Sequence, residues 1–393
     1  MGPVGLSSLA MKNAGWIGRS AKMRRYARTI ADNTAWTRDS LLGSDDWIIR
    51  LDETQKRELE QALQNWRRQG GLYHQASPDS FPLPHWQGVL ASVKRRLFDR
   101  GLVVIKGFPV ETNSVADCND MYWGLSTHLG VAVTQNNKGG LMIPVYDRAF
   151  RGETAEKQFG YSSNKELEFH IDMTDIFGLM CIHQAKYGGE TRLASAITIH
   201  NEMLAACPDL LEALYDGFIW MRRYPGGGDF SDPIPAFACS NGKVLTRFHR
   251  RYIDTGADVS GVPLTPLQRE ALDYFESLLG RPELVAEFRL EPGDVVYINN
   301  YSVLHAKKPH RDEGDRDKGR LLQRLWLYMQ EFDGYDLTMR QGPGRYGVVG
   351  LTSAEWWARQ EAARLWSSVG LPVPEAATTF TEDWPELEFA SAR

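Results

Sequence analysis

The stretch PGDVVYINNYSVLH, residues 292–305, combines a turn, an apolar strand and a histidine. Pro292, Gly293 and Asp294 are turn-forming residues, and the valine and isoleucine side chains after them favour a strand over 294–299. His305 follows shortly after the predicted end of that strand. The stretch therefore predicts a histidine that a rigid β element positions, which makes it a candidate ligand or catalytic residue.

Short apolar runs separated by turn residues continue through the chain from residue 140 onward. They predict strands over 141–146, 176–183, 192–196, 217–224, 243–248, 288–290, 294–299 and 325–330. Helices are expected at 199–214 and at 265–279, where Pro266 follows a Thr265 cap. Many short strands with few helices between them predict a closed or sandwiched β core.

The first third of the chain is richer in helical patterns. Helices are predicted over 52–69, 87–99 and 116–129, with a short buried strand over 101–107, and a last helix is expected over 353–366. We interpret residues 46–393 as one catalytic domain with helical decoration, after a basic N-terminal extension over 1–45. The predicted fold class is α+β with a mainly β core.

Composition and charge exclude several classes of protein. The 393 residues are 42% hydrophobic and 24% charged, with a net charge of −5, which is typical of a soluble globular protein without affinity for nucleic acids. No run of about 18 apolar residues predicts a membrane span. The expected partner is a small molecule, and a homo-oligomer stays open.

The cellular compartment is predicted from two weaker features. The four cysteines form no C-x-x-C pair and indicate free thiols in a reducing compartment, so the cytoplasm is expected. The first acidic residue is Asp32, and basic residues precede it, which is also typical of a mitochondrial transit peptide. A basic arm that packs on the acidic body is the alternative interpretation.

A second stretch, FHID at residues 169–172, supplies further candidate metal ligands. Residues i and i+2 of a strand point to the same face, so His170 and Asp172 can reach one ion. Together with His305 they make two histidines and one carboxylate, the ligand set of non-haem Fe(II) oxygenases. Such a set leaves positions open for a chelating co-substrate and O2, whereas H-x-D alone is a weak motif.

Two arginines follow His305 in GRLLQRLWLY, residues 319–328. Arg320 and Arg324 are four residues apart, so a strand directs both to one side, and their alternation with apolar residues indicates that they enter an interior. A guanidinium suits the distal carboxylate of 2-oxoglutarate, and the Thr191 hydroxyl in GGET is placed to help hold it. The alternative is a pair of exposed arginines on a strand edge.

In combination and in this order, these stretches resemble the taurine dioxygenase superfamily of Fe(II)/2-oxoglutarate enzymes, which includes the γ-butyrobetaine hydroxylases. The resemblance covers about residues 90–332. It implies a double-stranded β-helix, or jelly roll, with helices packed outside. It also implies iron ligation by His170, Asp172 and His305, and co-substrate binding by Thr191 and Arg320, with Arg324 near co-substrate or substrate.

Two departures from the family pattern bear on the substrate. No cysteine precedes Cys118, so the zinc module of the γ-butyrobetaine branch is absent. Glu166 stands where taurine dioxygenase contacts its substrate, and a negative charge there suits a cationic substrate better than a sulfonate. Tyr161 and Asn164 are further candidates for the substrate pocket, and Arg247 is a candidate partner for a carboxylate or phosphate.

We therefore expect an Fe(II)- and 2-oxoglutarate-dependent dioxygenase that uses O2 to oxidise a small polar metabolite, most simply by hydroxylation, with release of succinate and CO2. Desaturation or another oxidative rearrangement uses the same ligands and stays open. A non-oxidative cupin-like metalloenzyme also stays open, although it does not need Thr191 or Arg320. A jelly-roll binding protein without iron is disfavoured by the three intact ligands.

Overall fold

The computed structural model describes residues 25–70, 75–135, 140–153, 160–221, 230–231, 233–335 and 339. The expected helix over 353–366 and the first 24 residues, which carry most of the basic N-terminal segment, lie outside the described residues. Within the described residues the chain forms a mixed α/β fold with several β-sheets.

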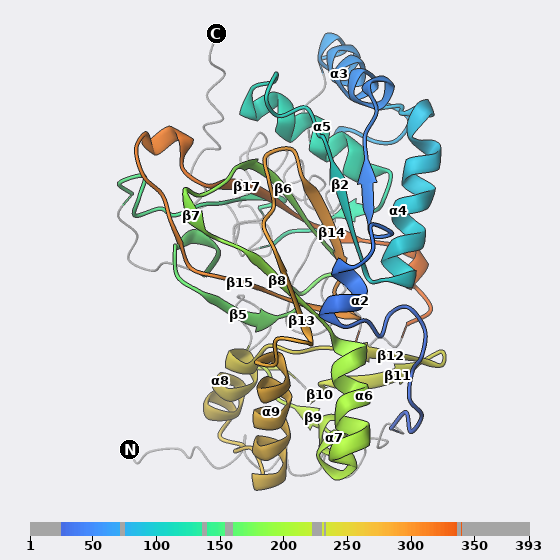
Figure 1. Ribbon diagram of the computed structural model, residues 1–393, viewed down its shortest axis with the longest axis vertical. Coiled ribbons are helices and arrows are strands. Elements are labelled where there is room, and N and C mark those ends of the chain that lie inside the picture. The colour runs from blue at the N-terminus through green and yellow to red at the C-terminus, as the bar shows by residue number, and fades with distance from the viewer. Residues whose placement is uncertain are drawn as a thin grey trace, which may run out of the picture.

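Two main sheets carry most of the strands. The larger sheet has the order β1-β2-β14-β6-β17-β3, with β4 also paired to β17, and the smaller has the order β13-β8-β15-β5. Figure 1 shows the smaller sheet between the larger sheet and a group of helices. The strands of these two sheets are β1 (Ile48–Arg50), β2 (Leu102–Lys106), β3 (Val131–Ala132), β4 (Met142–Val145), β5 (Leu167–His170), β6 (Ile176–His183), β8 (Thr191–Ser195), β13 (Val285–Phe288), β14 (Val295–Asn299), β15 (Val303–Lys307) and β17 (Leu321–Tyr328).

Three two-stranded sheets complete the β structure of the described residues. They pair β9 with β10, β11 with β12, and β7 with β16. Their bounds are β7 (Tyr187–Gly188), β9 (Gly217–Phe218), β10 (Ile234–Pro235), β11 (Phe237–Ser240), β12 (Lys243–Thr246) and β16 (His310–Arg311).

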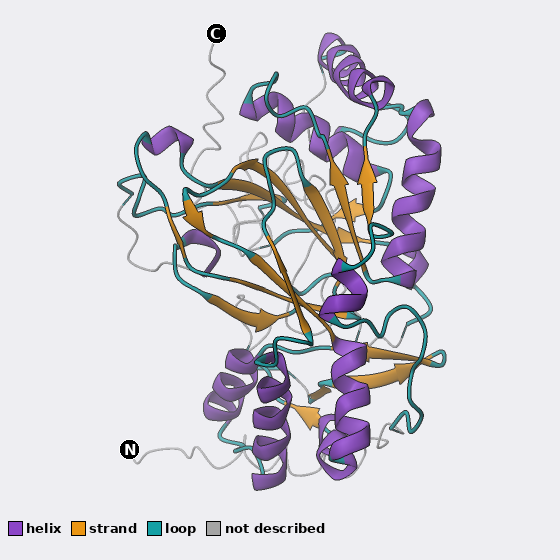
Figure 2. Cartoon of the chain, in the orientation of Figure 1, coloured by secondary structure: helices purple, strands orange, loops and turns teal. Residues whose placement is uncertain are grey.

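Most of the longer helices gather at two ends of the molecule, with the two main sheets between them (Figure 2). They are α2 (Arg38–Leu42), α3 (Glu53–Arg68), α4 (Gln87–Asp99), α5 (Val115–Thr127), α6 (Ala196–Ala206), α7 (Pro208–Leu214), α8 (Arg250–Ser260) and α9 (Pro266–Leu279), with short 3-10 turns over Pro84–Trp86, Gly160–Ser162, Arg316–Lys318 and Gln330–Phe332. Helix α4 packs on β2 and β14, and α6 packs on β8 and β15. No helix in the described parts of the chain is both long and apolar enough to span a bilayer.

Local sequence signals account for the helices near the N-terminus. The Asp52 side chain accepts from Gln55 N–H at 2.8 Å, and Gln55 Oε1 accepts from the Asp52 backbone N–H at 3.0 Å, so a capping box starts α3. Leu59, Leu63 and Trp66 form its buried face. The predictions over 52–69, 87–99 and 116–129 are confirmed to within two residues at each end.

The prediction of one continuous helix over 199–214 was wrong. The structure has two helices, α6 and α7, that meet at Cys207 and Pro208. Proline has no backbone N–H and clashes with the preceding turn, so it begins a new helix rather than continuing the old one. The strand predicted over 217–224 appears only as the short β9, and residues 222–229 lie outside the described residues.

His305 follows the end of the strand over 294–299, as predicted, but it lies in a second strand that was not predicted. The apolar run of β14 ends at Asn299, a turn over 300–302 follows, and the chain then enters a separate strand, β15, with His305 at its centre. The chain passes in this turn from the larger sheet to the smaller one. The histidine is therefore held by strand pairing on both sides rather than by a strand end.

Strand register determines which side chains face the space between the two main sheets. In the smaller sheet His305 pairs with His170 on β5 and with Leu193 on β8, while Lys307 pairs with Thr191. Paired residues, and residues two apart, project to the same face. We call this side, which carries His170, His305, Thr191 and Lys307, the inner face.

The larger sheet contributes a matching row from β6 and β17. Phe177 of β6 stacks on His305, with ring centroids 4.3 Å apart and an interplanar angle of 16°. Trp326 pairs with Phe177, and Arg324 pairs with Leu179, so these residues lie on the same side of their sheet as Phe177. The two sheets thus direct polar side chains toward one another at this place.

Candidate metal centre and co-substrate site

The three predicted iron ligands lie together in the structure. His305 and His170 are cross-strand partners whose ring centroids are 4.4 Å apart. Asp172 follows two residues beyond β5, where its backbone N–H donates to Asn300 Oδ1 at 3.1 Å. One ligand atom from each of the three side chains lies within 4.8 Å of the other two, and all three residues are buried. A single ion can therefore contact all three.

Neighbouring groups orient two of these ligands. His170 Nδ1 lies 2.8 Å from the carbonyl oxygen of Glu168, so that nitrogen carries the proton and donates. His170 Nε2 then directs its lone pair into the site, 3.7 Å from Asp172 Oδ1. Trp326 Nε1 donates to the other carboxylate oxygen, Asp172 Oδ2, at 2.8 Å, and Arg324 Nη1 lies 3.4 Å from the same atom. Asp172 Oδ1 is thereby left on the histidine side.

The surroundings also favour the protonation states in which these side chains bind metal. Burial lowers the pKa of His170, and burial with the nearby His170 and Arg324 lowers the pKa of His305 to about 3. Burial by itself raises the pKa of Asp172, but Arg324, the two histidines and Trp326 bring it below its usual value. Two neutral imidazoles and one charged carboxylate are the form of this donor set that fits Fe(II).

One ring nitrogen of a candidate ligand is unsatisfied within the described residues. His305 Nδ1 is buried and has no hydrogen-bond partner there. Buried polar atoms are almost always satisfied by protein, water or an ion. The residues present therefore fit a metal ion, both by their chemistry and by what they leave unsatisfied.

A group of basic side chains lies beyond His305. Arg320 precedes β17 and is 3% exposed, yet its Nε and Nη1 have no acceptor among the described residues. Burial and the Arg320 charge lower the pKa of Lys307 to about 7, and burial with Arg320 and Lys307 lowers that of His310 to about 3. Burial and the repulsion between these basic groups outweigh the opposing effect of Asp147 and Asp312 on the Lys307 pKa, so this end of the site is suited to an anionic ligand.

The two arginines predicted as anchors have different surroundings. Arg324 Nε donates to Gln135 Oε1 at 2.7 Å, and Arg324 Cζ lies 4.8 Å from the ring centre of Tyr161. Its guanidinium is already engaged next to Asp172. Arg320 keeps two N–H directions without an acceptor in the described residues, and Thr191 lies buried at the start of β8. Of the two, Arg320 has the capacity for a bidentate carboxylate.

Two of the predicted substrate residues, Tyr161 and Arg247, lie near the ligands. Tyr161 lies against Arg324, and residues 247–249 run beside the ligand segment, where Phe248 O accepts from Ile171 N–H at 2.9 Å. Arg247 is 1% exposed, with its Nη2 3.2 Å from Met173 Sδ.

Glu166 and Asn164 are not brought to the inner face. Glu166 has a side chain 54% exposed and pairs with Arg192 at 3.4 Å. Arg192 lies one residue past Thr191 and so points to the opposite face of the smaller sheet. Asn164 is exposed, and its backbone carbonyl accepts from His310 N–H at 2.9 Å. The structure therefore does not support the argument that Glu166 selects a cationic substrate.

Sequence reasoning missed residues that surround the ligands. Asn300 holds the ligand segment twice, by accepting from Asp172 N–H and by donating to Thr174 O at 3.0 Å. The position of Trp326 could have been predicted from the sequence. Trp326 lies two residues after Arg324 in the same strand, so both side chains project to the same face. The same spacing rule applies to Lys307, two residues after His305.

Replacement of Trp326 by phenylalanine is expected to weaken Fe(II) binding by about 10- to 100-fold, the usual effect of losing a group that orients a metal ligand. The indole N–H is the shortest hydrogen-bond donor to Asp172 Oδ2, and its loss lets the carboxylate rotate. Anaerobic equilibrium binding of Fe(II) measures the change. Trp86→Phe is a matched control, since Trp86 is buried and donates its indole N–H to Gln55 O at 3.0 Å away from the ligands. Equal Fe(II) affinity in Trp326→Phe and Trp86→Phe would contradict the prediction.

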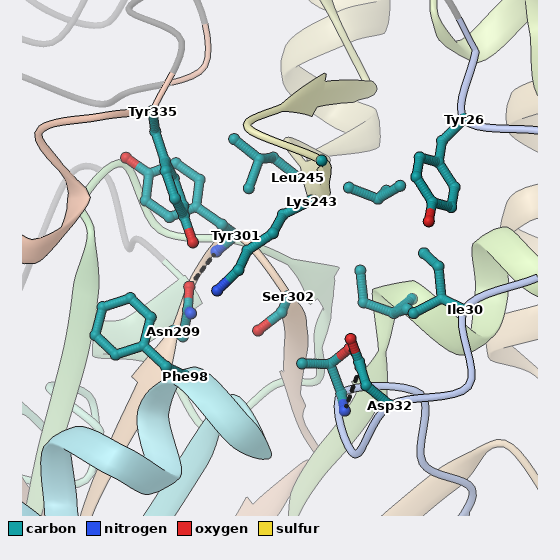
Figure 3. A pocket seen from close by; sticks show the side chains of 14 residues that line it. Tyr26, Ile30, Asp32, Phe98, Lys243, Leu245, Asn299, Tyr301, Ser302 and Tyr335 are labelled. Carbon is teal, nitrogen blue, oxygen red and sulfur yellow. Dashed lines mark hydrogen bonds between the residues drawn. The ribbon is translucent and has the colours of Figure 1, made fainter. Parts of the chain in front are cut away.

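A pocket in the described residues lies elsewhere. Figure 3 shows Tyr26, Lys243, Ser302 and Tyr335 around it, and none of the three predicted ligands is among its lining residues. Its walls come from the N-terminal arm, the β11–β12 hairpin and the turn after β14. This hollow is therefore distinct from the candidate metal centre.

Comparison with known families identifies the chemistry of this arrangement. Residues 55–326 match the taurine catabolism dioxygenase TauD, TfdA family. FR-33289 synthase of Streptomyces rubellomurinus is 31% identical over 310 residues, which cover 77% of this chain and 91% of that protein. Uridine-5'-phosphate dioxygenase of an Amycolatopsis species is 28% identical over 174 residues, which cover 42% of this chain and 62% of that protein.

Solved structures share the fold at low identity. An asparagine oxygenase, solved with Fe(II), 3-hydroxyasparagine and succinate, superposes with a TM-score of 0.57 at 16% identity, over 72% of this chain and 93% of the other. At this identity the similarity shows a common fold. It places the sheets and helices described above within the architecture of iron oxygenases.

Proposed function

Because the chain belongs to the TauD, TfdA family and is a 2-oxoglutarate-dependent non-haem iron dioxygenase, we propose that it hydroxylates a small polar metabolite and releases succinate and CO2. The observation that carries this proposal is the buried group of His170, Asp172 and His305 on facing strands. Hydroxylation is the outcome favoured by the name of another relative, a taurine hydroxylase-like protein of Stachybotrys chartarum that is 28% identical over 316 residues.

Each part of the site has a role in this proposal. His170, Asp172 and His305 hold Fe(II), which together with 2-oxoglutarate and O2 supplies the oxidising chemistry. Thr191 and Arg320 bind the distal carboxylate of 2-oxoglutarate and so set its orientation. Two neutral imidazoles and one carboxylate keep the ligand set at a single negative charge.

The side chains around the ligands limit access of water to the reacting atoms. Phe177 covers His305 from the larger sheet, and Trp326 and Arg324 cover Asp172. Exclusion of water strengthens the electrostatic contacts within the site and protects reactive species from side reactions. The protein thus supplies orientation, charge and a dry environment.

We infer further that the substrate carries an anionic group. Arg247 is a buried cation with its Cζ 4.8 Å from the ring centre of Trp220 and its Nη2 against Met173, the residue after Asp172. A carboxylate or phosphate suits such a guanidinium. One relative is named for uridine-5'-phosphate, whose phosphate is anionic, and the family is named for taurine catabolism. The position of Glu166, exposed and paired with Arg192 away from the ligands, is consistent with an anionic substrate.

We also propose a topology for the β core and boundaries for the catalytic domain. The two main sheets face each other and direct His305 and Arg324 inward, which is the arrangement expected of a double-stranded β-helix. We propose residues 46–393 as one catalytic domain built on that core.

A substrate screen tests the proposed function. Fe(II)-loaded enzyme is incubated with 2-oxoglutarate, O2 and anionic, zwitterionic or quaternary ammonium metabolites, and succinate release above the uncoupled background is measured together with product mass. Metabolites with a carboxylate or phosphate are expected to stimulate release and to gain 16 mass units, the mass of one oxygen atom, and Arg247→Met is expected to reduce this stimulation selectively. Stimulation by quaternary ammonium compounds alone would overturn the substrate class.

The product mass also separates the alternative outcomes. A product lighter by two hydrogens indicates desaturation, which uses the same ligands. Absence of any succinate in the presence of Fe(II) would contradict the dioxygenase assignment and favour a non-oxidative use of the metal.

A further inference from the structure

Lys307 lies in the co-substrate region, although no motif pointed to it. It is two residues past His305 in β15, so its side chain shares the inner face with the ligand. Across the smaller sheet it is paired with Thr191. The ammonium group is therefore carried into the same space as the threonine hydroxyl proposed to bind 2-oxoglutarate.

The buried environment of Lys307 leaves its charge poorly compensated. The residue is 8% exposed, and its Nζ donates to Ser163 O at 2.7 Å and lies 3.4 Å from His310 Nδ1. No carboxylate of the described residues lies within 4.0 Å of Nζ. A buried ammonium with only neutral partners is costly, and it has three N–H donors to satisfy.

Arg320 approaches the same region from the larger sheet. It lies close to Gly189, in the link between β7 and β8, where a Cβ would come within 3.3 Å of Arg320 Nε. Like Lys307, it has no carboxylate within 4.0 Å among the described residues. His310 lies between the two cations, because a Gly189 Cβ would also come within 3.3 Å of His310 Cβ, and His310 Nδ1 lies 3.4 Å from Lys307 Nζ. Both cations can therefore approach one anion beside this histidine.

The acidic residues nearby form no ion pair with either cation. Asp312 Oδ1 accepts from the backbone N–H of Arg320 at 2.9 Å, whereas its Oδ2 has no hydrogen-bond partner in the described residues and lies 3.8 Å from His310 Nε2. Asp147 Oδ1 accepts from Ala149 N–H at 3.1 Å. Neither carboxylate forms an ion pair with Lys307 or Arg320, so both cations remain available to a bound ligand.

We propose that Lys307 is a second cationic anchor for the distal carboxylate of 2-oxoglutarate, acting together with Arg320 and Thr191. A carboxylate offers about four acceptor positions, enough for two N–H groups of Arg320, the Thr191 hydroxyl and one N–H of Lys307. This inference rests on the proposed function. In this proposal Lys307 favours an oxoacid with a second carboxylate over one without it, because Lys307 contacts only the distal carboxylate.

An anaerobic titration of the Fe(II)-loaded enzyme tests the proposal. The probes are 2-oxoglutarate and 2-oxopentanoate, which has a methyl group in place of the distal carboxylate, and the visible absorption of the Fe(II)–oxoacid chelate reports binding. Lys307→Met is expected to weaken 2-oxoglutarate binding by about 10- to 100-fold, as for loss of a hydrogen bond to a charged group. The affinity for 2-oxopentanoate should stay within about twofold, and Lys307→Arg should recover most of the loss.

Lys308→Met provides the matched control. Lys308 is the adjacent lysine, and it pairs with Glu287 at 2.6 Å on the other face of the sheet, so both affinities should match those of the wild type. Equal weakening of both oxoacids in Lys307→Met would indicate a merely structural role and overturn the inference, as would unchanged 2-oxoglutarate binding. Failure of the wild-type enzyme to bind 2-oxoglutarate would instead overturn the proposed function, and the inference with it.

Discussion

Replacement of Asp172 by alanine is expected to abolish 2-oxoglutarate turnover. The substitution removes the only anionic ligand of the proposed iron site and leaves Arg324 buried beside neutral groups. Loss of a group that merely orients a metal ligand typically costs 10- to 100-fold, so loss of the ligand itself should exceed about 100-fold in Fe(II) affinity and in succinate release. Both quantities are measured on the purified variant, the first under anaerobic conditions.

Stability has to be separated from metal binding in this experiment. Breaking a buried ion pair typically costs about 3–5 kcal/mol, so Asp172→Ala is also expected to unfold at a lower temperature. Asp294→Asn is the matched control, because Asp294 is a buried carboxylate paired with Lys106 at 2.9 Å outside the site. It should lose stability and still bind Fe(II). Near-normal turnover in Asp172→Ala would eliminate the site assignment.

Replacement of Arg320 by methionine is expected to raise the apparent KM for 2-oxoglutarate by at least about 100-fold. The change removes two buried N–H groups that have no acceptor in the described residues and that we assign to the distal carboxylate. Each hydrogen bond to a charged group contributes about 1.5–3 kcal/mol, and 1.4 kcal/mol corresponds to a tenfold change in affinity. Steady-state succinate release at varied 2-oxoglutarate measures the effect.

The companion variants distinguish the two arginines. Arg324→Met should chiefly weaken Fe(II) binding, because Arg324 contacts Asp172 and Gln135. Arg67→Met, which removes an exposed arginine paired with Asp120 at 2.8 Å, should leave the KM unchanged. Removal of the uncompensated charge of Arg320 should not lower the melting temperature of the metal-free protein. A KM effect confined to Arg324→Met would reverse the assigned order of the two arginines.

Much of the local structure could be predicted because its causes are local. The capping box at Asp52 and the cap at Thr265 each start a helix within a few residues of chain. The break at Pro208 is equally local, and the prediction failed there because the apolar spacing was weighed above the missing backbone N–H. Helix α8 was not predicted, because basic residues such as Arg250 and Arg251 at its start occur equally in helices and at strand ends.

The candidate site was predictable only in part. His170 and Asp172 are two residues apart, so the spacing rule for strands brought them together on one ion. The same rule, applied to Trp326 and Lys307, would have found two more inner-face residues. Glu166 was misplaced because its face depends on how β5 and its preceding segment meet β8, and Arg192 lies 26 residues away along the chain.

The sequence by itself determined the ligand types, their order and the short apolar strands that carry them, because residue chemistry and the two-residue period of a strand are properties of the chain alone. Only the tertiary structure decided that His305 lies opposite His170 and that Trp326 donates to Asp172 across 154 residues. It also decided that Lys307 and Arg320 both lie near His310, with no described counterion within 4.0 Å of either. Strand register and sheet packing set these relations, and both arise from the burial of apolar surface by the whole chain rather than from any single segment.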